Sequence, residues 1–192
     1  MTDNTKTLLH KKIIGFTPAN QASIDKLFEA ASKRQLSKGE TILKQGQVCK
    51  KIVFVEKGYL RTFIVNDGLD INTDFTFENN FTTNLRSLRS SLPSDTTIQA
   101  GEASIIYEFD KDELLELYKS SPEIESFGRK LLEQLLMMQE EHINLFKLFT
   151  PTERYNYLRT HKPQIIQRVS VSQLSSYLGV ARETLSRIRK KR

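Results

Sequence analysis

The sequence predicts an α+β protein in which an N-terminal β jelly-roll barrel is followed by a long helix and a C-terminal helix-turn-helix. Three patterns lead to this prediction. Short apolar runs between glycine turns fill residues 36–109, an apolar stripe at helical spacing runs from Leu131 to Phe149, and two short amphipathic segments flank Gly179. The expected units are a barrel domain at residues 1–120, the long helix at 121–149 and the helix-turn-helix at 150–192.

The N-terminal part begins with a short amphipathic helix and continues as strands. Thr17 as a cap and Pro18 at the first helical position predict a helix over residues 18–31. The Asn66-Asp67-Gly68 segment is a strong hairpin signal. Many short strands with regular turns are typical of a β-sandwich or jelly-roll barrel. The expected strands are Thr41–Leu43, Ile52–Val55, Tyr59–Val65, Ile71–Phe77 and Ser104–Phe109.

After a short helix at Lys111–Tyr118, a longer helical pattern covers residues 122–149. Its apolar stripe has spacings of 4, 3, 4, 3 and 4 residues, a heptad pattern suited to a coiled-coil seam. We favour a seam between two copies of the chain, and hence a homodimer. The alternative is a helix packed on its own barrel. The predicted seam residues are Leu131, Leu135, Met138, His142, Leu145 and Phe149.

A new helix is expected at Thr150-Pro151-Thr152-Glu153, which combines a capping box with proline at the first helical position. Further on, Ser170 or Ser172 can cap the first of two short helices, and Gly179 supplies the turn between them. The residues that share the inward faces of these two helices are Val171, Leu174, Tyr177, Leu178, Leu185 and Ile188. The outward face of the second helix carries most of its charge.

The basic charge of the chain is concentrated in this last unit. Residues 150–192 hold ten Lys or Arg residues against two acids, a net charge of +8, whereas the whole chain carries +6. A local basic excess on an amphipathic helix pair is typical of a surface that binds nucleic-acid phosphates. The alternative is a surface helical hairpin with solvated charges.

Composition argues against several other classes of protein. Cys49 is the only cysteine, so an internal disulfide is excluded, and we expect a reducing, cytoplasmic location. No apolar stretch is long enough to span a membrane, and Met1–Lys12 lacks the apolar centre of a signal peptide. The three histidines, His10, His142 and His161, lie outside the predicted barrel, so a cupin-like metal site is not expected. Without a nucleophile motif or phosphate loop, we expect no enzyme, no catalytic residues, no metal and no cofactor.

The order of barrel, long helix and helix-turn-helix resembles the CRP/FNR family of bacterial transcription regulators. The most specific match is Arg182-Glu183-Thr184-Leu185-Ser186-Arg187-Ile188, which is similar to that family's recognition helix; Lys38–Gly46 and Ile52–Arg61 resemble its opening strands. The resemblance implies double-stranded DNA and RNA polymerase as partners, with Arg182, Glu183 and Arg187 reading base edges. The residues expected to contact phosphates are Ser170, Ser172, Thr184, Ser186, Arg189 and Lys190.

The resemblance fails where a cyclic nucleotide is held. Family members that bind cyclic AMP use Phe-x-Gly-Glu-Leu, and the matching segment here is Phe81-Thr82-Thr83-Asn84-Leu85, with Thr83 and Asn84 replacing glycine and glutamate. Asp95 stands near the expected arginine and should repel a phosphate. Arg86 and Arg89 are the candidate substitutes. We therefore expect no control by cyclic AMP, and either an unknown small-molecule effector or none.

Relatives often continue past the recognition helix into a β-hairpin wing, whereas this sequence stops at Arg192, so the wing is expected to be missing. The terminal Arg189-Lys190-Lys191-Arg192 run is the candidate replacement for its contacts. The alternative function is a ligand-binding or protein-interaction module with a vestigial DNA-binding domain.

Overall fold

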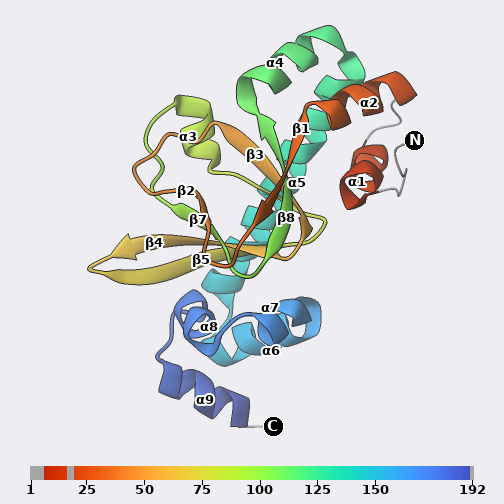
Figure 1. Cartoon of the computed structure of the whole chain (residues 1–192). Coiled ribbons are helices and arrows are strands. Elements are labelled where there is room, and N and C mark those ends of the chain that lie inside the picture. The colour runs from red at the N-terminus through yellow and green to blue at the C-terminus, as the bar shows by residue number, and fades with distance from the viewer. Residues whose placement is uncertain (1–6, 17–19, 191–192) are drawn as a thin grey trace.

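The computed structural model describes residues 7–16 and 20–190 and contains a β-sandwich, a long helix and a C-terminal group of helices (Figure 1). The sandwich consists of two antiparallel four-stranded sheets, with strand orders β1-β8-β3-β6 and β2-β7-β4-β5. The strands are β1 (Ala31–Leu36), β2 (Thr41–Leu43), β3 (Lys51–Lys57), β4 (Tyr59–Asn66), β5 (Leu69–Phe77), β6 (Phe81–Thr82), β7 (Thr97–Ala100) and β8 (Ser104–Asp110). The predicted mixed α+β fold with an N-terminal sandwich is confirmed.

Helices surround the sandwich at both ends of the chain. Those before and within the sandwich are α1 (Leu8–Phe16), α2 (Gln21–Glu29), α3 (Leu85–Ser90) and α4 (Lys111–Ser120). Those after it are α5 (Pro122–Leu148), α6 (Pro151–His161), α7 (Pro163–Arg168), α8 (Val171–Leu178) and α9 (Arg182–Lys190). Figure 1 shows α5 running along the sandwich and leading to α6–α9 at the opposite end from α2 and α4.

Several local predictions are confirmed by the backbone. Asp67 and Gly68 have φ of 49° and 75°, as the tight hairpin between β4 and β5 requires. Thr150 and Glu153 form the predicted capping box at the start of α6. The first helix differs, because α2 begins later than expected and Asn20 caps it by accepting from the Ser23 amide at 2.9 Å. Thr17 and Pro18 lie outside the described residues.

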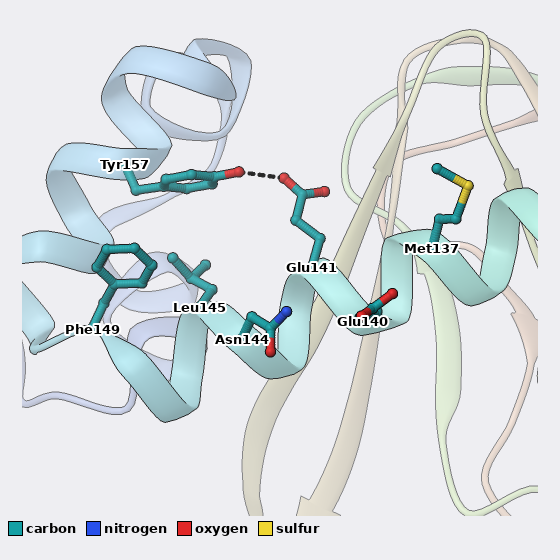
Figure 2. Close-up of a pocket in the computed structure, with 7 residues that line it drawn as sticks. All are labelled: Met137, Glu140, Glu141, Asn144, Leu145, Phe149 and Tyr157. Atoms are coloured by element: carbon teal, nitrogen blue, oxygen red, sulfur yellow. Dashed lines mark hydrogen bonds between the residues drawn. The ribbon is translucent and has the colours of Figure 1, made fainter.

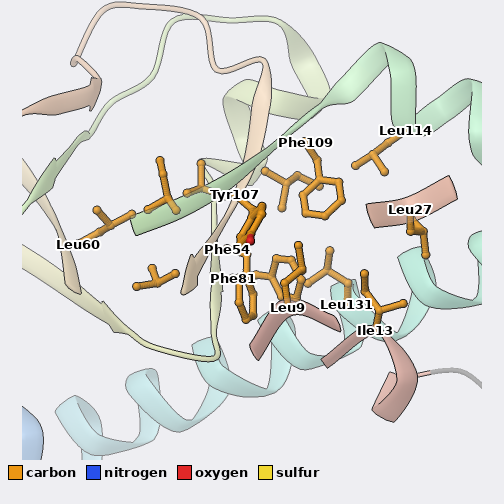
Figure 3. Packing of buried hydrophobic residues seen from close by; sticks show 14 of the residues in the cluster. Leu9, Ile13, Leu27, Phe54, Leu60, Phe81, Tyr107, Phe109, Leu114 and Leu131 are labelled. Carbon is orange, nitrogen blue, oxygen red and sulfur yellow. The ribbon is translucent and has the colours of Figure 1, made fainter. Parts of the chain in front are cut away.

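The main hydrophobic core lies between the two sheets and extends beneath α1, α2, α4 and α5. Figure 3 shows Leu9 and Ile13 of α1 and Leu131 of α5 around the barrel aromatics Phe54 and Phe81. Phe54 and Phe81 stack at 4.9 Å between ring centroids. Helix α5 is therefore part of the barrel core along its N-terminal half.

A second hydrophobic core joins the sandwich to the C-terminal helices. Tyr59, Phe75 and Phe77 contribute to it from strands β4 and β5. The members from the C-terminal half are Leu145, Tyr155, Leu158, Ile165, Val169, Leu174, Tyr177, Leu178 and Leu185. Because barrel aromatics are buried in this core, the C-terminal helices are packed onto the barrel and not merely tethered to it.

Candidate nucleic-acid interface

Helices α8 and α9 form the predicted pair around Gly179. Ser170 caps α8 by accepting from the Gln173 amide at 3.2 Å. Gly179 has φ of 68°, a left-handed conformation in which a side chain would be strained. The Gly179 amide donates to the Ser176 carbonyl and the Val180 amide to the Ser175 carbonyl, which closes the C-terminus of α8. The turn thus follows directly from the sequence.

Helix α9 is attached by one side only. Leu185 is fully buried and Ile188 is half-buried, whereas the three predicted base-reading residues, Arg182, Glu183 and Arg187, are all exposed. Of the predicted phosphate-binding residues, Ser172 and Thr184 are half-buried; those that are exposed are Ser170, Ser186, Arg189 and Lys190. The outward side of α9 therefore presents four cations and a single carboxylate.

Two side chains pre-arrange this surface. Arg182 donates to the Ser172 hydroxyl, which links the start of α9 to the start of α8. Arg187 donates to Thr184 Oγ1 at 3.3 Å, one turn earlier on the same helix. These bonds hold the guanidinium groups along the surface of α9 in the absence of a partner.

Some of the basic residues counted in the C-terminal segment are used internally. The Arg154 guanidinium donates to the carbonyls of Phe146, Phe149 and Leu178 at 3.0–3.2 Å. Lys162 pairs with Glu141 of α5 at 3.1 Å, and Arg168 pairs with glutamates of the sandwich. The charge available to phosphates is consequently smaller than the net charge of the segment, and it is concentrated on α9.

A cavity of about 480 Å³ lies between the sandwich, α5 and the C-terminal helices. Of the predicted pocket residues, Phe81, Thr83, Asn84 and Arg86 line it, whereas Arg89 is exposed near the far end of α3 and does not. The prediction for Arg89 is wrong because the α3 helix turns its side chain away. Residues that the sequence did not point to also line the cavity: Thr62, Thr73, Asp74, Gln139, Lys162 and Tyr177.

One end of the cavity is closed by its own side chains. The Asn84 amide donates to Asp95 Oδ1 at 2.8 Å and to the hydroxyls of Ser94 and Thr96 at 3.0 Å, while Asn84 Oδ1 caps α3. Arg86 lies 3.9 Å from Asp95. The carboxylate of Asp95 thus occupies the donors at this end that an anionic ligand would need.

The other end of the cavity joins three structural units. Asp74 comes from β5, His142 from α5 and Tyr177 from α8, and the Tyr177 hydroxyl lies 3.2 Å from His142 Nδ1. Desolvation raises the pKa of Asp74 despite the nearby His142 and Lys162. Burial lowers the pKa of His142, against the opposing effect of Asp74. Both side chains are therefore held toward their neutral forms.

The predicted dimer seam is wrong in register. Leu131 and Leu145 are 1% and 3% exposed and pack within the two cores of the same chain. Leu135 packs against the barrel, Met138 lines the cavity and His142 stacks on Tyr177 at 5.6 Å. Only Phe149 remains partly exposed, at 37%. The stripe is the face by which α5 packs on its own protomer, the alternative considered from the sequence.

The exposed apolar residues of α5 lie on its other side. Leu132, Leu136 and Ile143 are 46%, 62% and 47% exposed. They follow the predicted stripe by one residue. Beside them, Met137 and Phe149 border a groove of about 350 Å³ between α5 and α6, where the Tyr157 hydroxyl donates to Glu141 at 2.5 Å (Figure 2).

With this geometry in place, comparison with known proteins is informative. Residues 33–121 match the cyclic nucleotide-binding domain. A search of curated proteins finds no match to the chain. Within residues 7–16 and 20–190, no group of three or more His, Cys, Asp or Glu side chains is arranged to hold a metal ion. In the same residues, none of the helices has the length and apolar character needed to cross a membrane.

Solved structures with the same fold are regulators with a sensor domain of this type. FixK2 from Bradyrhizobium japonicum has a TM-score of 0.68 at 17% identity, covering 84% of this chain and 83% of that one. CLP from Xanthomonas campestris, a c-di-GMP responsive global regulator, has 0.66 at 18%, covering 90% and 91%. The catabolite activator protein of Thermus thermophilus has 0.56 at 18%, covering 91% and 84%. The likeness to CRP/FNR regulators therefore extends over both halves of the chain.

The state of Asp74 gives a pH-dependent prediction. Because its pKa is raised above the ordinary 3.8, the stability that its neutral form contributes is fully present below that pH and is lost as pH rises through the raised value. Asp74→Asn stays neutral, so it should unfold at higher denaturant than wild type near pH 7 and converge with wild type near pH 4. Asp67→Asn in the exposed hairpin is the control. Urea unfolding across this range checks it, and a difference independent of pH would contradict the assignment.

Proposed function

We propose that this chain is a DNA-binding transcription regulator of the CRP/FNR type, which binds a two-fold symmetric operator as a homodimer and is not controlled by cyclic AMP. The observation that carries the proposal is the outward side of α9. Arg182, Arg187, Arg189 and Lys190 are exposed there, with Glu183 as the one acid, on a helix whose opposite side is anchored by Leu185. A helix presented in this way can enter the major groove of DNA.

The chemistry of the side chains separates two roles on this helix. Arginine forks match the acceptors of guanine, and a carboxylate accepts from the amino group of cytosine, so we assign base reading to Arg182, Glu183 and Arg187. Hydroxyls at the start of α8 and cations at the end of α9 flank this region and suit phosphates. We assign phosphate contacts to Ser170, Ser172, Thr184, Ser186, Arg189 and Lys190.

We propose that two copies associate through the outward side of α5, with RNA polymerase and an unidentified effector as further partners. Leu132, Leu136 and Ile143 are spaced four and seven residues apart, which is a heptad spacing. The groove beside Met137 continues this apolar surface toward α6. Contact here would place two α9 helices about a two-fold axis.

The dimer proposal predicts the effect of charge on this surface. Leu136→Glu should shift the protein from dimer to monomer, because an unpaired carboxylate would be buried between two helices. Leu115→Glu changes a leucine of similar exposure on α4 and should leave the dimer intact. Light scattering at micromolar concentration measures both, and a Leu136→Glu variant that stays dimeric would rule out this seam.

Cyclic AMP should neither bind at micromolar concentration nor alter DNA affinity. The reason is that Asp95 already uses the donors of Asn84 and lies beside Arg86, so a phosphate would meet a carboxylate at this end of the cavity. Calorimetry of the intact protein with cyclic AMP is the measurement. Saturable micromolar binding, reduced by Arg86→Ala, would show that the cavity accepts the nucleotide after all.

The two roles on α9 should separate in DNA titrations. Arg187→Ala should cost about 1 to 3 kcal/mol on the specific duplex and relax the preference at one base position in each half-site. Lys190→Ala should weaken specific and scrambled duplexes alike and reduce the salt slope by about one unit per contact. Equal loss on both duplexes for Arg187→Ala would refute its base-reading role. Absence of DNA binding by the intact protein would refute the proposed function.

A further inference from the structure

Arg168 joins the C-terminal helices to the sandwich. It ends α7, immediately before the segment that begins α8, and its guanidinium reaches two loops of the sandwich. It donates to both carboxylate oxygens of Glu78 at 2.7 and 2.8 Å and to Glu102 at 2.6 Å. Bidentate arginine–carboxylate bonds are directional as well as strong. This one side chain therefore fixes an angle between two units as well as a distance.

The surroundings of Arg168 restrict it further. Its guanidinium lies 5.0 Å from the ring centre of Phe77 and 5.7 Å from that of Tyr59. Glu78 also accepts from the Gly58 amide at 2.8 Å. Although burial alone would raise the pKa of Glu78, the bonds from Arg168 and Gly58 hold that pKa below its ordinary value. The pair stays ionised at neutral pH.

A second anchor lies at the other end of β5. The Ser176 hydroxyl of α8 donates to the Asp70 carbonyl at 2.9 Å and accepts from the Asn72 amide at 3.0 Å. Since β5 is the edge strand of its sheet, these backbone groups have no neighbouring strand to pair with, and α8 covers them. Between the two anchors, Tyr177 packs edge-on against Phe75 at 5.3 Å.

The covalent connection leaves orientation to these contacts. Only Phe149 and Thr150 separate α5 from α6, and Arg154 bonds across this joint, so the hinge restrains the position of the C-terminal helices. Rotation about the hinge is opposed mainly by contacts farther away, along β5. Removing the guanidinium would leave Glu78 and Glu102 facing the same space without a cation, and their repulsion would favour separation.

We propose that Arg168 is a positioning residue that sets the separation of the two recognition helices, so that the protein selects the spacing of operator half-sites through a contact that never touches DNA. The inference rests on the proposed function. In a two-fold dimer, a rotation of the C-terminal helices in one protomer is repeated in the other, so the separation of the α9 helices changes twice over. Half-site spacing is matched to that separation.

The first test measures DNA affinity on duplexes whose half-sites are moved apart or together by one or two base pairs. Arg168→Gln should lower the affinity ratio between the best and the shifted spacings by about tenfold, or 1.4 kcal/mol. Its base preference within each half-site should remain that of wild type. Arg168→Lys should be intermediate, because it keeps the charge and loses the fork. Lys162→Gln removes a pair that does not involve β5 and should keep the wild-type spacing profile.

The second test needs neither DNA nor a dimer. Spin labels at Lys38→Cys and Ser186→Cys, in a Cys49→Ser background, report the distance between sandwich and α9 within one chain when labelled protein is diluted with unlabelled protein. Pulsed electron paramagnetic resonance should give a narrow distribution for wild type and a broad or displaced one for Arg168→Gln. An unchanged distribution in folded Arg168→Gln, or an unchanged spacing profile, would overturn the inference. Failure of wild type to bind DNA, with the distance still dependent on Arg168, would instead remove the proposed function and the spacing role with it.

Discussion

The docking of the C-terminal helices on the edge strand β5 is the interaction on which the rest of the structure depends. One edge of β5 pairs with β4, and the other gives its carbonyl and amide at Asp70 and Asn72 to Ser176. Its side chains contribute Asp74 to the cavity and Phe75 and Phe77 to the second core. A displacement of this strand would therefore reach the cavity and the helix pair together. We infer that any effector acts by changing how β5 and α8 meet.

Helix α5 connects the same parts from a different side. Its inward face contributes Leu131 to the barrel core and Leu145 to the second core, while His142 meets Tyr177 beside the cavity. This leaves only its outward face available for a second copy. The division explains how one helix can belong to two cores and still present an apolar surface.

The sequence was sufficient for the elements with strong local signals. The alternating strands, the Asp67-Gly68 turn, the capping box at Thr150 and the Gly179 turn were all predicted, because each depends on neighbours in the sequence. Strands β1, β6 and β7 were missed, since they are short or polar and exist only through pairing with β8, β3 and β4. Helix α1 was missed for a similar reason, because Leu9 and Ile13 are buried only by tertiary contacts.

The candidate site was predicted unevenly. The exposed side of α9 follows from the positions of Leu185 and Ile188, so its charged residues could be assigned from periodicity. Periodicity could not tell which heptad stripe of α5 faces its own barrel, because the two stripes differ by one residue and have similar spacing. Nor could composition show that Arg154 and Arg168 bond within the chain, because their acceptors are distant in sequence.

The measurement that tests the account most directly is selection of bound duplexes from a random-sequence pool by the intact protein. The account predicts an inverted repeat with half-sites about one helical turn apart, around 10 base pairs between centres. The same selection with an Arg182→Ala, Arg187→Ala variant should lose the motif while retaining salt-dependent binding to DNA in general. No enriched motif with the wild-type protein, or the same motif with the variant, would contradict the assignment of α9 as the helix that reads DNA.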